Sequence, residues 1–286
     1  MNILVTGASG QLGSEIKEVS KYYKTNHQFF FENSSKVNIT DKVNINKYIE
    51  NNNINVVINC AAYTAVDKAE SESELAENVN AEGVKNLISA LPKEGKLIHI
   101  STDYVFNGQS HLPYQETDEV NPLGVYGSTK RNGEQYVIDA TIQSIIIRTS
   151  WVYSSYGHNF VKTMLRLGTE KGHLRVISDQ IGTPTYAKDL AKLCLSLIDK
   201  NLSKTSKIYH YSNEGVASWY DFAKSIMELG EIDCKLIPIE TKDYPTLAQR
   251  PSYSLLNKSK IKRDFSIEIP HWRDSLKQCI EIIAKK

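Results

Sequence analysis

Hydrophobic and polar positions follow one another in a regular rhythm along the first half of the chain. Short apolar runs, each of strand length, occupy Met1–Thr6, Gln28–Phe31, Asn55–Ala61, Lys96–Ser101 and Ser144–Arg148. Between them, apolar residues recur at helical spacing in the segments Leu12–Val19, Val43–Ile49, Glu72–Leu91 and Tyr126–Ile138. Strands that are apolar throughout and separated by helices predict an α/β fold, a doubly wound parallel sheet covered on both faces.

The regular alternation of strand-like and helix-like segments ends after Trp151. Helical patterns at Asn159–Leu167, Lys188–Leu197 and Trp219–Met227 are mixed with short strands and proline-containing loops. We therefore expect a dinucleotide-binding domain at residues 1–150. Residues 151–286 are expected to form mainly a smaller substrate-binding domain, some segments of which can return to the first domain.

The composition of the chain argues against nucleic-acid, membrane and metal partners. The 286 residues are 41% hydrophobic and 23% charged, with a net charge of +1. This balance gives no sign of a nucleic-acid partner or a membrane surface, and no apolar run approaches the ~20 residues of a membrane helix. The four cysteines are scattered, as in a reduced cytoplasmic protein, and the seven histidines have no metal-binding spacing, so no metal site is predicted.

A glycine-rich turn follows the first predicted strand. Gly7, Gly10 and Gly13 stand between that strand and a helix. Without side chains, the backbone turns tightly and approaches a pyrophosphate at the helix N-terminus, as in a Rossmann domain. The first spacing is Gly-x-x-Gly, one residue longer than the common dinucleotide-binding pattern.

The end of the second strand leaves the cofactor open between NADH and NADPH. Glu32 is near the position where an acidic residue binds the adenosine ribose and repels a 2′-phosphate. The following segment, Asn33 to Lys36, offers hydroxyls and a cation that could hold that phosphate. Glu32 could equally be a solvated strand end.

The pattern Tyr-x-x-x-Lys indicates the chemistry, although it occurs twice, at Tyr126/Lys130 and Tyr220/Lys224. Tyr220 lies in a late helix and is interpreted as core or surface. Tyr126 follows the nucleotide-binding elements, so we expect it to donate a proton, with the Lys130 ammonium lowering its pKa. Thr102, at the end of a neighbouring strand, is expected to orient a substrate carbonyl. Such a set serves hydride transfer with a nicotinamide cofactor.

These features resemble the extended short-chain dehydrogenase/reductase superfamily. Motifs along nearly the whole chain, among them STDYVFNG, NPLGVYGSTK, DQIGTPTYAKDLA and RPSYSLLN, look like those of its dTDP-4-dehydrorhamnose reductase family. The resemblance implies reduction of the C4 keto group of dTDP-4-dehydro-L-rhamnose to dTDP-L-rhamnose with NADPH or NADH. It also admits a homodimer.

The resemblance further implies a role for each matching residue. Gln11, Leu12 and Gly13 hold the pyrophosphate; Glu32, Asn38 and Ile39 lie near the adenosine; and Ala61, Ala62 and Tyr63 line the cofactor. Thr102, Asp103 and Trp151 contact the sugar, and Asn80 supports Lys130 through water. Without the resemblance, Trp151 would be interpreted as an ordinary core residue.

Charged residues are also candidates for a diphosphate contact and for magnesium ligands. Arg250 is expected to contact the diphosphate, because a guanidinium forks onto phosphate oxygens, although it could be a surface charge. Some relatives form a magnesium-bridged dimer; Glu15 matches one ligand position, but Asp189 replaces another. The sequence therefore argues against magnesium but leaves its binding open.

Two other functions compete with the reductase. The same fold could carry out a nucleotide-sugar epimerisation or reduce a different keto sugar. Related folds also serve as non-catalytic regulatory subunits. A reductase consumes cofactor stoichiometrically, an epimerase retains it, and a regulatory subunit has no need of Tyr126 as an acid.

Overall fold

A parallel sheet organises the molecule. The computed structural model describes residues 1–23, 26–202, 204 and 206–285. Within them, six strands form one sheet in the order β10-β5-β4-β3-β1-β2, and every neighbouring pair is parallel. The predicted α/β fold with a doubly wound parallel sheet is confirmed.

Five of these strands correspond to the apolar runs of the first half: β1 (Asn2–Thr6), β2 (Gln28–Glu32), β3 (Ile54–Asn59), β4 (Lys96–Thr102) and β5 (Gln143–Thr149). The sixth, β10 (Lys207–His210), comes from the second half and pairs with β5. This strand was not predicted from the sequence.

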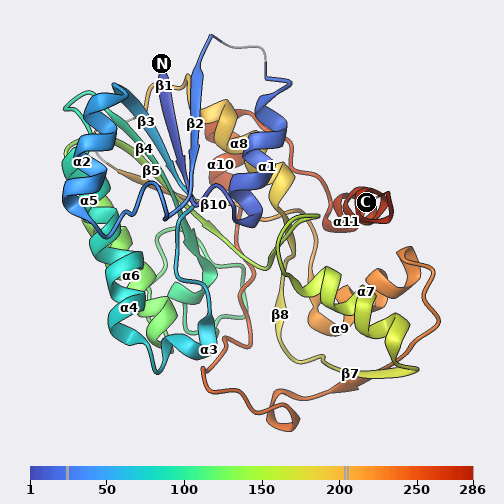
Figure 1. The fold of residues 1–286 in the computed structure, drawn as a ribbon. Helices are drawn as coiled ribbons and strands as arrows, with labels where there is room; N and C mark the ends of the chain where they lie inside the picture. Colours follow the sequence, from blue (N-terminus) through green and yellow to red (C-terminus); the bar gives the residue numbers. More distant parts are fainter. Residues whose placement is uncertain (24–25, 203, 205, 286) are drawn as a thin grey trace.

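Helices cover both faces of the sheet (Figure 1). On one face, α1 (Gln11–Ser20) and α8 (Ala187–Leu197) pack on Ile3 and Val5. On the other, α2 (Lys42–Asn51) and α5 (Gly83–Ala90) share a core with Leu4. Side chains alternate along a strand, so an apolar run supplies both cores. The helix α6 (Val125–Ile138) belongs to the second face and carries Tyr126 and Lys130.

The segment predicted as one helix at Glu72–Leu91 is divided. After the short α3 (Val66–Ala69), helix α4 (Ser73–Glu77) runs into a π-helical turn, η1 (Asn78–Glu82), before α5. In η1, Asn80 accepts a hydrogen bond from the amide of Tyr63 and donates to the Tyr63 carbonyl and the Thr129 hydroxyl. Such turns arise where tertiary contacts draw a residue out of the helical pattern.

The rest of the second half forms a core of its own. It contains α7 (Phe160–Glu170), α9 (Trp219–Leu229) and α11 (Trp272–Ala284), with β7 (His173–Ile177) parallel to β12 (Lys235–Ile239). The remaining elements are η2 (Asp103–Val105), β6 (Val152–Tyr153), β8 (Ile181–Gly182), β9 (Thr185–Tyr186), β11 (Ala217–Ser218), η3 (Thr241–Asp243) and α10 (Ser259–Phe265). The division into residues 1–150 and 151–286 stays a prediction.

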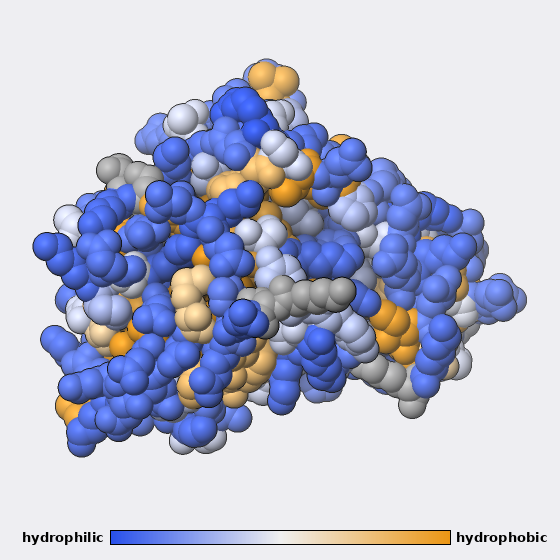
Figure 2. All heavy atoms as spheres, turned by 90° about the horizontal axis from the view of Figure 1, so that it is seen from above, coloured by the Kyte–Doolittle hydropathy of each residue, from blue (hydrophilic) through white to orange (hydrophobic). Residues whose placement is uncertain are grey.

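The surface is mainly polar in the view from above, where hydrophobic side chains occur in small groups (Figure 2). Among the described residues, none of the helices combines the length and the apolar character needed to span a bilayer.

A glycine sets how closely α6 approaches η1. A Cβ added at Gly133 would overlap the carbonyl oxygen of Asn80, which is backbone and cannot move aside. We expect Gly133→Ala to lower the free energy of unfolding by about 1–3 kcal/mol. Gly172→Ala, where a Cβ would meet nothing within 4 Å, is the matched control and should change stability by less than about 0.5 kcal/mol. Chemical denaturation measures both, and equal effects would contradict the close approach.

Candidate active site

A cavity of about 880 Å³ opens at the carboxyl ends of the sheet strands. Gly7 follows β1 and Cys60 follows β3, and the strand order reverses between these two strands. Doubly wound sheets bind their ligands at such a point. The predicted site residues that line the cavity are Gly7, Gly10, Gln11, Leu12, Asn38, Ile39, Ala61, Ala62, Tyr63, Thr102, Asp103, Tyr126, Lys130 and Trp151. Gly13, Glu32 and Arg250 are not part of this lining.

The glycine turn fits an anionic ligand. Gly7 has a φ of 63°, and a Cβ there would lie 2.7 Å from the Ala61 nitrogen. Gly13 stands behind the turn, where a Cβ would lie 2.5 Å from the Gly7 oxygen. The N-cap of α1 is Gly10, so no side chain caps the first-turn amides. Amides left in this way suit the pyrophosphate of a dinucleotide.

Glu32 is held by two partners beside this turn. Its carboxylate accepts hydrogen bonds from the Tyr48 hydroxyl and the Lys36 ammonium, each at 2.6 Å. The following residues, Asn33 and Ser34, line the cavity. The negative charge of Glu32 is therefore compensated, which weakens its repulsion of a 2′-phosphate. Tyr48 was not identified from the sequence.

Tyr126 and Thr102 both line the cavity, and the Tyr126 ring packs edge-on against Tyr104, with ring centroids 5.4 Å apart. Burial raises the pKa of Tyr126 to about 12, while the neighbouring Thr102 hydroxyl opposes this rise. Burial therefore governs the pKa of Tyr126 in this structure, and the expected lowering by Lys130 stays a prediction.

Lys130 lies one helical turn further along α6 and is only 2% exposed. Its ammonium donates to the carbonyl of Ile100 at 2.7 Å. Burial lowers its pKa to about 8, and the nearby Glu134 carboxylate opposes this change. Asn80, expected to support the lysine, is connected to α6 through the Thr129 hydroxyl at 3.0 Å.

Two stacked tryptophan side chains form part of the cavity lining. Trp151 has a φ of 48° and stacks on Trp219, with ring centroids 3.7 Å apart. A positive φ is costly for a bulky residue and is found mainly at functional sites. Trp219, the first residue of α9, also lines the cavity, whereas the sequence predicted only that it belongs to a helix. Tyr220 and Lys224 lie outside the lining.

Arg250 is engaged outside the lining. Its guanidinium donates to both carboxylate oxygens of Asp67, on α3, at 2.7 and 3.1 Å. The amide of Ala248 donates to the same carboxylate. The hydrogen bonds from Arg250 hold the pKa of Asp67 below its usual value. The pair thus ties the segment 244–250 to the sheet half.

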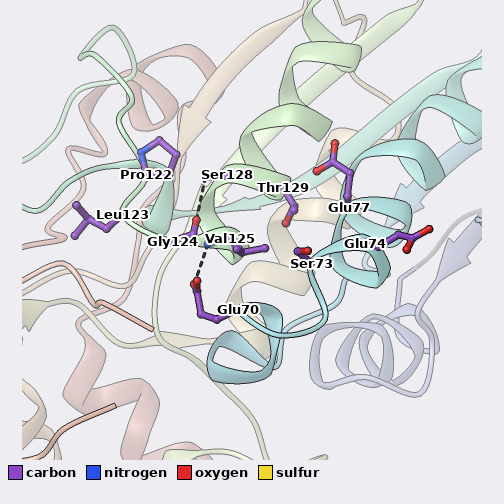
Figure 3. A pocket seen from close by; sticks show the side chains of 10 residues that line it. All are labelled: Glu70, Ser73, Glu74, Glu77, Pro122, Leu123, Gly124, Val125, Ser128 and Thr129. Carbon is purple, nitrogen blue, oxygen red and sulfur yellow. Dashed lines mark hydrogen bonds between the residues drawn. The ribbon is translucent and has the colours of Figure 1, made fainter. Parts of the chain in front are cut away.

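A second pocket, of about 550 Å³, lies beside the N-terminal end of α6 (Figure 3). Glu70 points to the start of this helix, and its carboxylate accepts a hydrogen bond from the Val125 amide at 2.9 Å. A carboxylate there completes the capping that Gly124 cannot provide. We interpret Glu70 as fixing the catalytic helix rather than as contacting a ligand.

The two carboxylates discussed for magnesium have protein partners. Glu15 accepts a hydrogen bond from Ser154, and Asp189 accepts from Ser275 and Asn213. Within the described part of the chain, no group of three or more His, Cys, Asp or Glu side chains could hold a metal ion.

Comparison with known proteins gives one family. A family model described as "RmlD substrate binding domain" matches residues 1–285. The dTDP-4-dehydrorhamnose reductase of Aggregatibacter actinomycetemcomitans is 41% identical over 96% of this chain and 97% of its own. That of Escherichia coli (strain K12) is 37% identical, covering 98% and 97%.

Two solved structures agree over almost the whole chain. The dTDP-4-dehydrorhamnose reductase of Clostridium acetobutylicum gives a TM-score of 0.91 at 40% identity, covering 99% of this chain and 100% of that one. The dTDP-4-dehydrorhamnose reductase of Bacillus anthracis, in complex with NADP, gives 0.91 at 35% identity, covering 98% and 99%.

The burial of Asp103 predicts a dependence of stability on pH. Burial raises the pKa of Asp103 from 3.8 to about 6. Between these values the folded state binds more protons than the unfolded state, so the free energy of unfolding falls as the pH rises. We expect Asp103→Asn to remove this loss. Relative to the wild type, the free energy of unfolding of the variant should rise by roughly 3 kcal/mol between pH 4 and pH 7.

Chemical denaturation at the two pH values measures this gain. Asp118→Asn, at an exposed aspartate, controls for the loss of one carboxylate. A stability difference between wild type and Asp103→Asn that is the same at both pH values would contradict the burial cost.

Proposed function

We propose that this chain, which belongs to the family of the RmlD substrate binding domain and the dTDP-4-dehydrorhamnose reductases, reduces the C4 keto group of dTDP-4-dehydro-L-rhamnose. The product is dTDP-L-rhamnose, and the reductant is NADPH or NADH. The observation that carries the proposal is the meeting of Tyr126, Thr102 and Lys130 in the cavity below the glycine turn. No other function is favoured by a specific observation.

The cofactor end of the cavity is assigned to residues of the first half. Gly7, Gly10, Gln11 and Leu12 hold the pyrophosphate at the start of α1, with Gly13 allowing the helix to sit against the turn. Asn38 and Ile39 lie at the adenosine end, and Ala61, Ala62 and Tyr63 follow β3 along the cavity. When bound, the reduced nicotinamide supplies the hydride.

The protein supplies the proton. Tyr126 keeps its phenolic proton at neutral pH, because its pKa is about 12. It donates this proton to the carbonyl oxygen as the carbon gains the hydride, so the ketone becomes an alcohol. Thr102 orients the same oxygen, and the Lys130 ammonium stabilises the tyrosinate that is left. Asp103, next to Thr102, contacts the sugar.

The substrate end is assigned to the second half. Trp151 and Trp219 present flat apolar rings to the deoxysugar, and Arg250 contacts the diphosphate from the segment 244–250. A homodimer and a cytoplasmic location, expected from the family and from the scattered cysteines, remain predictions.

Substituting the proposed proton donor tests this function. We expect Tyr126→Phe to lower kcat by about 10²–10⁴-fold, because general acid catalysis contributes that much, and to leave cofactor binding intact. The assay follows oxidation of NADPH and NADH in parallel with dTDP-4-dehydro-L-rhamnose.

Tyr220→Phe is the matched control, since it alters the second Tyr-x-x-x-Lys pattern on α9 outside the cavity lining, and it should keep full activity. Near-normal turnover of Tyr126→Phe would contradict the assignment. Cofactor that is retained and not consumed would indicate an epimerase, and cofactor binding without any turnover a regulatory subunit.

The proposed contact of Arg250 with the diphosphate can be tested by exchanging Arg250 and its ion-pair partner Asp67. If Arg250 contacts the diphosphate, Arg250→Ala should raise KM by about 10–150-fold, the loss of a charged hydrogen bond. The double variant Asp67→Arg with Arg250→Asp restores the ion pair but places a carboxylate where the cation was, so its KM should stay high.

Glu240→Gln controls for breaking an ion pair just before this segment, since Glu240 pairs with Lys242 on the surface. A double variant that regains the wild-type KM would show that Arg250 only anchors the segment.

A further inference from the structure

We propose that Glu134, paired with Arg148, is a positioning residue for the reaction: it fixes the height of α6 on the sheet and sets the electrostatic environment of the Lys130 ammonium. The inference rests on the proposed function, because it assigns to Lys130 the charged role given above. It concerns a pair of residues that no step of the mechanism has used.

The ion pair is wholly inside the protein. Arg148 Nε donates to one oxygen of the Glu134 carboxylate at 2.8 Å, and Nη2 donates to the other at 2.7 Å. The side chains are 2% and 0% exposed. Burying two charges is costly, and an apolar pair of similar volume often serves stability as well. Such a pair is therefore a candidate for a role beyond stability.

Its place on the helix connects it to the chemistry. Glu134 lies one turn after Lys130 and two turns after Tyr126, so the three side chains share one face of α6. Arg148 stands near the end of β5, beside Ser101 of β4 in the sheet register. Thr102, the next residue of β4, reaches the cavity. The bidentate pair thus fixes the helix bearing the acid relative to the strand bearing the orienting hydroxyl.

The guanidinium is itself held in place. Arg148 lies 5.1 Å from the centre of the Phe106 ring, and Phe106 stacks on Tyr114 at 4.1 Å. A planar guanidinium between a carboxylate and a ring face has little freedom to turn. The carboxylate of Glu134 is therefore a fixed charge next to the lysine rather than a mobile one.

Several groups face Lys130 or the helix that carries it. The ammonium interacts electrostatically with Glu134, with Cys60 after β3 and with His99 of β4, and burial holds the pKa of His99 well below its usual value. Glu134 is the carboxylate among them. Arg131 also approaches Glu134, at 4.0 Å. On the outer side of α6, Glu70, Glu77 and Glu82 bond to Val125, Asn132 and Tyr136.

The test is the pH dependence of the Glu134→Gln variant. Lys130 is cationic below its pKa, so activity falls as the pH rises through about 8. Without the Glu134 carboxylate, less opposes the lowering of the Lys130 pKa by burial. We therefore expect the fall of kcat at alkaline pH, its alkaline limb, to move to lower pH by about one unit. Binding of NADPH, followed by its fluorescence without any sugar, should show the same displacement.

A double variant separates this effect from stability. Glu134→Gln with Arg148→Met removes the unpaired guanidinium, so it should recover Tm relative to Glu134→Gln while its alkaline limb stays displaced. Glu82→Gln, the same change in η1, where the carboxylate accepts a hydrogen bond from Tyr136 of α6, should leave the limb in place. A folded double variant whose limb returns to the wild-type position, or Glu134→Gln with an unmoved limb, would overturn the proposal.

The fluorescence measurement distinguishes this outcome from a failure of the proposed function. A wild type that binds NADPH with an alkaline limb but reduces no dTDP-4-dehydro-L-rhamnose would refute the substrate assignment. The comparison of Glu134→Gln with Glu82→Gln in cofactor binding would still decide the role of Glu134.

Discussion

The burial of one ammonium group, that of Lys130, is the constraint on which the site depends. A lysine that is 2% exposed needs compensating groups at fixed positions, and the carbonyl of Ile100 and the carboxylate of Glu134 provide them. Both act only if α6 lies close to the sheet. Gly127 and Gly133 let α6 lie close to η2 and η1, because a Cβ at either would overlap a backbone carbonyl, of Tyr104 and Asn80 respectively. The π-helical turn at Asn80 is thus part of the same arrangement.

Other residues that line the cavity also lower the stability of the folded protein. Burial disfavours the charged form of Asp103, and Trp151 adopts a positive φ where it stacks on Trp219. Each feature costs free energy in the folded protein, and each faces the same cavity. A structure selected for stability alone has no reason to collect these costs in one place.

Local patterns predicted the sheet half and its glycine turn, because fully buried parallel strands have an unmistakable apolar signature. Strands β7, β10 and β12 were not identified, since short strands with exposed positions lack that signature. The division of the helix at Asn80 depends on contacts with Tyr63 and Thr129, which no local pattern reveals. The partners of Glu32 and Arg250, and the burial that governs the pKa of Tyr126, are likewise tertiary properties.

The cofactor turn and the second half are not independent parts. Gln11, in the first turn of α1, donates to the Val152 carbonyl and accepts from Asn159, the N-cap of α7. One turn later, the buried Glu15 accepts from Ser154. The helix whose N-terminus faces the pyrophosphate therefore also holds the loop that follows Trp151. The start of α1 and this loop, at the two ends of the cavity, are therefore held together by the same few hydrogen bonds.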